Sequence, residues 1–189
     1  AAEADRRGGR LGLSFERLEE ALEHADDSGR SDGLVATMTS AIHSLAAGRG
    51  PEDFVRQLEH LLMRSRRPPA DRALINVTLA ALAQARLSDG DVRSAELFVR
   101  QIDREGSQLP PAAVLVGARA ALDAANPVEA KAWLDGLAAD LAASDRAVDP
   151  ETDLHLLHVR AETAVELGDD DDGRPLVNDL IRRSAGVRG

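Results

Sequence analysis

The chain has 189 residues, of which 43% are hydrophobic and 30% are charged, the proportions of a folded protein rather than a disordered one. Its 33 acidic residues outnumber its 23 Lys and Arg residues and give a net charge of −10, which disfavours binding to the negative phosphates of nucleic acids. With no cysteine and no apolar stretch long enough to cross a bilayer, we expect no disulfide, no thiolate metal site and no membrane span.

Helical periodicity, interrupted at short intervals by Gly, Pro, Asn and Asp, runs along the whole chain. Because aromatic residues make up only 2%, the core must consist of Ala, Leu and Val, which favours close-packed helices over sheets. We therefore expect an all-α fold. The predicted helices are 13–25, 34–45, 54–62, 73–87, 92–102, 114–124, 127–141, 150–167 and 176–181.

The expected organisation is one helical domain over residues 11–184, with a disordered or linker segment at 1–10 and a tail at 185–189. The chain begins with Ala1 rather than Met, so we expect a piece of a longer protein with further repeats upstream.

Three segments of the chain share one pattern: a helix, a short turn, and a second helix with a small residue near its start. The turns are Gly90-Asp91, Ala125-Asn126 and Gly168-Asp169. The small residues are Ala95, then Ala130 after 35 positions, then Gly173 after a further 43. The second spacing is longer than the first because a polar insertion at 143–146 lies within it. Phe98 and Trp133 occupy one repeat position, where we expect them to pack between second helices.

This pattern resembles the tetratricopeptide repeat (TPR) family, reasonably over residues 70–184 and weakly over 11–62. The resemblance implies an α-solenoid of tandem helix-turn-helix repeats whose concave groove, lined by the first helix of each pair, binds a protein or peptide. The repeats are degenerate, because Leu79 or Val114 and Arg86 or Ala121 replace the family's usual tryptophan and tyrosine. A different α-solenoid or a helical bundle is the alternative.

No common catalytic signature is present, so we expect neither an enzyme nor a cofactor. The only lysine, Lys131, lies between two alanines inside a helix and not in a phosphate-binding loop, and none of the five histidines begins an H-E-x-x-H motif. The acidic run at 169–172 fits a calcium-binding loop poorly. Gly168, which has no side-chain ligand, would stand at the first position of the loop, and Asp179 would stand at the last position in place of the usual Glu. We expect this run to cap the last helix instead.

The strongest candidate site is a set of residues spaced by three, four and four, which places them on one helix face. They are His155, His158, Glu162 and Glu166. The resemblance implies that this face lines the groove. Three interpretations are open: the polar side of an amphipathic helix, a partner-binding patch, or ligands for a divalent metal.

Three further polar residues, Asn76, Gln84 and Arg119, lie on otherwise apolar first helices. They would either hydrogen-bond an extended peptide in the groove or pair with neighbouring repeats. The family's carboxylate clamp needs lysines that this chain lacks, so that mode of binding is not expected. The basic residues Arg64, Arg66 and Arg67 indicate a solvated linker between repeats or a short contact to a phosphate or an acidic partner.

The sequence thus predicts a non-catalytic protein-protein or peptide interaction module. Arg in place of Lys, with abundant Ala, indicates a GC-rich bacterial source, and the resemblance implies a regulatory or scaffold region of a larger cytoplasmic protein. The alternative is a small-molecule-sensing domain of a bacterial transcriptional or signalling regulator, with its ligand inside the superhelix.

Overall fold

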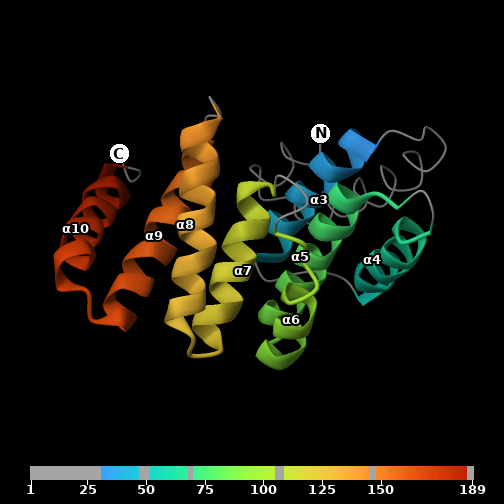
Figure 1. The fold of residues 1–189 in the computed structure, drawn as a ribbon, viewed down its shortest axis with the longest axis horizontal. Coiled ribbons are helices and arrows are strands. Elements are labelled where there is room, and N and C mark those ends of the chain that lie inside the picture. Colours follow the sequence, from blue (N-terminus) through green and yellow to red (C-terminus); the bar gives the residue numbers. More distant parts are fainter. Residues whose placement is uncertain (1–30, 47–51, 68–69, 105–108, 145–147, 187–189) are drawn as a thin grey trace. The chain divides into compact units, whose positions relative to one another are not determined.

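The computed structural model describes residues 31–46, 52–67, 70–104, 109–144 and 148–186, and these form eight α-helices and no strand (Figure 1). The helices are α3 (Ser31–Ala46), α4 (Glu52–Ser65), α5 (Arg72–Ser88), α6 (Val92–Val99), α7 (Pro111–Asp123), α8 (Pro127–Ala143), α9 (Pro150–Leu167) and α10 (Asp170–Gly186). The predicted all-α fold is confirmed. The helix predicted at 13–25 and the segment predicted at 1–10 lie outside the described residues.

Most predicted helix boundaries differ from the structure by a few residues, and two of these differences have a clear local cause. The helix predicted at 92–102 ends at Val99, and the chain continues through two short backbone turns. The helix predicted at 176–181 begins earlier, at Asp170, because the Asp169 side chain accepts a hydrogen bond from the Asp172 N–H at 3.2 Å. The acidic run therefore caps α10, as predicted, and α10 extends into the predicted tail.

The chain divides into two compact units, residues 1–113 and 114–189. In the first unit α5 is the central helix and packs on α3, α4 and α6. Its middle residues are fully buried, including Val77, Leu79 and Leu82. In the second unit α9 packs between α8 and α10. That residues 11–184 form one continuous array stays a prediction.

One turn geometry recurs in all three repeats. The residue that ends the first helix has a positive φ: 78° at Gly90, 56° at Ala125 and 69° at Gly168. The next N–H bonds back to a carbonyl five residues earlier, at 2.8 Å for Asp91, 2.8 Å for Asn126 and 2.9 Å for Asp169. This is the Schellman ending of a helix, which requires one residue in the left-handed conformation.

The residue after each turn also starts the second helix. The side chains of Asp91, Asn126 and Asp169 each accept a hydrogen bond from the backbone N–H three residues later, at 3.1, 3.2 and 3.2 Å. At Asp91, hydrogen bonds with the Ser94 side chain and backbone hold the pKa of the carboxyl below its ordinary value. The predicted repeat register is confirmed, because the same capping chemistry recurs at the same positions.

Ala125 is the only non-glycine residue with a positive φ among the described residues. We expect Ala125→Gly to raise the free energy of unfolding by about 0.5–1 kcal/mol, because glycine removes the Cβ strain of this conformation. The matched change Gly168→Ala introduces that strain, and we expect it to lower stability by about 1 kcal/mol. Urea unfolding followed by the fluorescence of Trp133, the only tryptophan, measures both changes. A destabilised Ala125→Gly would contradict this account.

Small residues allow the two helices of a pair to approach. Ala95 and Ala130 are fully buried at the predicted crossing positions, and Gly173 is buried against Ala164. The prediction that Trp133 packs between second helices is wrong. Its ring lies in α8 against Gly117 of the first helix α7, and only 3% of Trp133 is exposed. The ring fits there because Gly117 has no side chain.

Candidate functional site

The structure brings together two groups of residues that the sequence predicts separately. Arg119 on α7 donates from Nη1 to Glu162 Oε2 on α9 at 2.8 Å. Glu162 Oε2 also lies 3.7 Å from His158 Nε2, one helical turn away. Arg119 Nε contacts Asp123 Oδ1 at 2.9 Å. Sequence reasoning missed Asp123, although its position four residues after Arg119 is the usual spacing of a helical ion pair.

Residues on α7 and α9 that share this polar surface are named the α7/α9 face. They are Arg119, Asp123, His155, His158, Glu162 and Glu166. The opposite side of α9 is apolar, and Leu157, Ala161 and Ala164 are each at least 92% buried there. Burial of that stripe turns the polar side to solvent, so His155, His158 and Glu166 are exposed.

The α7/α9 face is long rather than compact. His155 and Glu166 are eleven residues apart on one helix, a rise of about 16 Å. All four residues predicted on α9 therefore cannot converge on one metal ion. The described residues contain no group of three or more His, Cys, Asp or Glu close enough to hold one. An elongated row of this kind suits a linear ligand better than a single atom.

The ion pairs of this face are open to solvent. The side chains of Arg119, Glu162 and His158 are 40%, 36% and 57% exposed. Exposed pairs stabilise a fold by only about 0.2–1 kcal/mol each. Breaking these ion pairs therefore costs little free energy. Their donors and acceptors can exchange one partner for another.

Asn76 has a different environment from the one expected of a groove residue. It lies on α5 with 2% exposure, its Nδ2 donates to the Asp103 carbonyl at 2.9 Å, and its Oδ1 accepts from the Asp103 N–H at 3.0 Å. The amide thus fixes the chain after α6. Gln84, also on α5, is half-buried and donates to Ser88 Oγ at 3.3 Å within its own helix.

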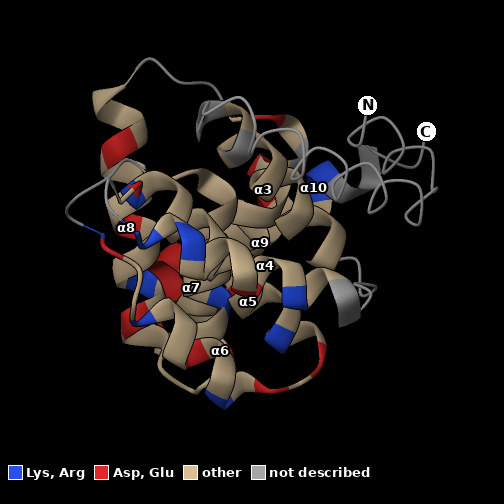
Figure 2. Cartoon of the chain, turned by 90° about the vertical axis from the view of Figure 1, so that its right-hand side faces the viewer, with Lys and Arg blue, Asp and Glu red and all other residues tan. Residues whose placement is uncertain are grey.

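Basic residues on α5, and Arg66 between α4 and α5, contact other parts of the first unit. Arg66 Nη2 donates to Gln101 Oε1 at 2.7 Å. Arg86 on α5 contacts Glu59 on α4 at 3.6 Å, and Arg72 contacts Asp103 at 3.3 Å. Acidic and basic residues are interspersed on several described helices (Figure 2).

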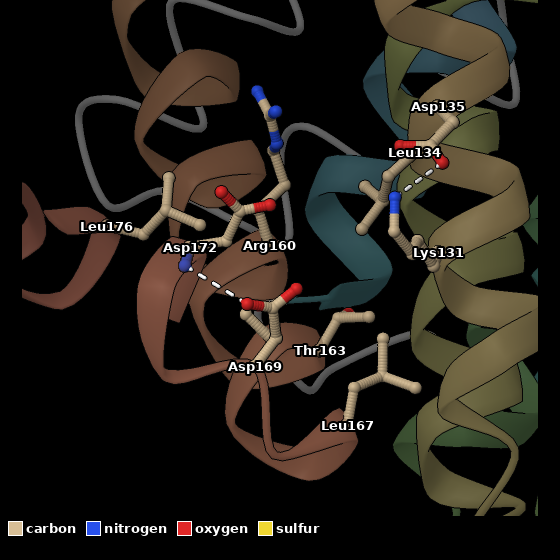
Figure 3. A pocket seen from close by; sticks show the side chains of 10 residues that line it. Lys131, Leu134, Asp135, Arg160, Thr163, Leu167, Asp169, Asp172 and Leu176 are labelled. Carbon is tan, nitrogen blue, oxygen red and sulfur yellow. Dashed lines mark hydrogen bonds and ion pairs between the residues drawn. The ribbon is translucent and has the colours of Figure 1, made fainter. Parts of the chain in front are cut away.

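A cavity of about 50 Å³ lies between α8, α9 and α10 of the second unit (Figure 3). On the α8 wall, Lys131 Nζ donates to Asp135 Oδ2 at 2.7 Å. This hydrogen bond, with smaller contributions from Asp172 and Asp169, raises the pKa of Lys131 above its ordinary value. Sequence reasoning missed this cavity, because its lining comes from three helices and shows no single spacing.

None of the described helices combines the length and apolarity that a membrane span requires. No protein-family model and no curated protein matches the sequence. The fold is similar to two solved structures of a Podosopora anserina putative kinesin light chain with nearly identical TPR-like repeats. Their TM-scores are 0.58 and 0.57 and their identities 18% and 19%; the matches cover 99% and 98% of this chain and 92% of each of those chains.

Proposed function

The chain has a TPR-like repeat fold, and from that premise we propose that it is a non-catalytic module that binds a protein segment through the α7/α9 face. Stacked repeats offer extended surfaces for such segments without a dedicated pocket. The fold alone does not select a surface, because every repeat has several exposed faces.

The contact between Arg119 and Glu162 is the observation that carries this choice. It joins the first helices of two consecutive repeats, so that polar side chains of α7 and α9 form one row. Within each helix, the spacing of four residues places His158 next to Glu162 and Asp123 next to Arg119. Donors and acceptors therefore alternate along a surface that crosses from one helix to the next.

An extended segment would bind by exchanging its own polar groups for these exposed pairs. The guanidinium of Arg119 offers five N–H donors, and the carboxylates of Glu162 and Glu166 accept from backbone or side-chain N–H groups. Exchange of this kind costs little, because each pair is already hydrated. Asn76 is left out of the proposed surface, since its amide is committed to Asp103.

The wider context of this module rests on its composition and on the TPR resemblance. Arg in place of Lys, with abundant Ala, supports a bacterial source. The resemblance implies a regulatory or scaffold region of a larger protein in the cytoplasm, in signalling or in the regulation of transcription. The alternative, a domain that senses a small molecule, needs an enclosed space. The α7/α9 face is exposed, so ligand sensing would use the cavity between α8, α9 and α10.

Selection of a displayed random-peptide library on the full chain tests the proposal. Affinities of the selected peptides are then measured for the wild type and for a variant with His155→Ala, His158→Ala and Glu162→Ala. We expect this variant to weaken binding by about tenfold or more, as the loss of charge-assisted hydrogen bonds predicts.

The matched control is a triple variant of exposed charged residues on α8 and α10. It carries Asp140→Ala, Asp170→Ala and Arg174→Ala. We expect the control to bind the same peptides as the wild type does. Equal binding by both variants would show that the peptides use another surface and would refute the assignment of the α7/α9 face.

A further inference from the structure

The cavity between α8, α9 and α10 combines opposite charges with an apolar base. Asp169, Asp172 and Arg160 line the wall formed by α9 and α10, and the Lys131–Asp135 pair lines the α8 wall (Figure 3). All of these residues belong to the second unit. Concave sites with a few converging polar groups are the usual places where small molecules bind.

Two charged groups of this cavity are free to bind a ligand. In the described part of the chain, neither the Arg160 guanidinium nor the Asp172 carboxylate has a hydrogen-bond or ion-pair partner. The Asp169 carboxylate uses one oxygen to cap α10 and keeps the other. The guanidinium of Arg160, the carboxylate of Asp172 and one carboxylate oxygen of Asp169 are therefore available on the same wall of the cavity.

The base of the cavity is apolar and buried. Leu134 and Ala164 are 5% and 7% exposed, and the Thr163 hydroxyl donates to the Val159 carbonyl of its own helix at 2.7 Å. Leu176, which is half-buried, and Leu167, which is 36% exposed, complete the apolar lining nearer the surface. An occupant would thus meet charge at the rim and leucine side chains below it.

We propose that this cavity binds a small zwitterion of the α-amino-acid class with an apolar side chain. The ligand's ammonium group would lie against Asp169 and Asp172, its carboxylate against Arg160, and its side chain against the leucines. Lys131 on the facing wall is already paired with Asp135.

The cavity's size agrees with this class of ligand. One water molecule needs roughly 10–15 Å³ of such a volume, so that about 50 Å³ accepts about four heavy-atom groups. The isobutyl side chain of leucine is of that size, and the charged end of the amino acid stays at the rim, against Arg160, Asp169 and Asp172. A nucleotide or a sugar phosphate is too large and too anionic for a wall with two aspartates.

This inference rests on the ligand-sensing alternative and not on the peptide-binding face. Arg160 is two residues from both His158 and Glu162 and therefore points to a different side of α9. A variant with His155→Ala, His158→Ala and Glu162→Ala would keep amino-acid binding, and Arg160→Gln would keep peptide binding. The two proposals can therefore fail separately.

Calorimetric titration of the full chain with three matched compounds is the test. L-leucine carries both charges, isoamylamine lacks its carboxylate, and 4-methylpentanoate lacks its ammonium group. We expect L-leucine to bind and each single-charge compound to bind about tenfold more weakly or worse, because each loses a charge-assisted hydrogen bond.

The variants Arg160→Gln and Asp172→Asn should each weaken L-leucine binding by about tenfold or more. Arg174→Gln is the matched control, since Arg174 is exposed on α10 and pairs with Asp170 outside the cavity. Absence of L-leucine binding to the wild type would overturn the proposal, as would unchanged binding to Arg160→Gln. Equal binding of isoamylamine would overturn it too, because the site would then accept any amine, such as a lysine side chain of a partner protein.

Discussion

Replacement of Gly117 by alanine should lower the free energy of unfolding of the second unit by about 2 kcal/mol, a typical cost of overpacking a core. A Cβ at this position would lie 2.5 Å from Cε2 of Trp133 and 2.6 Å from its Cδ2. The ring is 97% buried, so it cannot move aside without losing other contacts. Urea unfolding followed by Trp133 fluorescence reports both the stability and the displacement of the ring.

Gly136→Ala is the matched control, because this glycine is also helical and a Cβ there would meet no atom within 4 Å. We expect that change to stabilise α8 by about 0.5–1 kcal/mol through better helix propensity. If both substitutions stabilised the protein, Trp133 would not pack on Gly117 as the structure has it.

Asn76→Ala should cost about 1–3 kcal/mol, because it leaves the N–H and carbonyl of Asp103 without the amide that bonds both. The measurement is urea unfolding by circular dichroism, together with hydrogen exchange of the Asp103 amide. We expect that amide to lose protection before the remainder of α5 does.

Gln84→Ala serves as the comparison on the same helix. Its amide makes a weak 3.3 Å bond within α5, so we expect a change in stability within about 0.5 kcal/mol. A negligible cost for Asn76→Ala would contradict this account, because the two hydrogen bonds to Asp103 would then contribute little to stability.

Features that depend on neighbouring residues could be predicted from the sequence. A turn of this kind is favoured by a residue that tolerates a positive φ, as Gly90 and Gly168 do, followed by a capping side chain, as Asp91 and Asp169 are. In the third turn Asn126 supplies the cap, and Ala125 adopts the positive φ at a cost in strain. The helix face of His155, His158, Glu162 and Glu166 follows in the same way from helical geometry. Local chemistry thus determined the helices, their turns and the repeat.

Features that depend on distant residues were decided only by the tertiary structure. Arg119 and Glu162 are 43 residues apart, and Asn76 and Asp103 are 27 apart. No periodicity links such positions, because their contact depends on how one helix packs on the next. Packing likewise placed Trp133 on Gly117 and brought Arg160 and Asp172 to one cavity. The sequence by itself determined that helices and turns alternate along the chain and which side chains share a helix face, and packing decided which of these polar groups bond to one another and which stay open to a ligand.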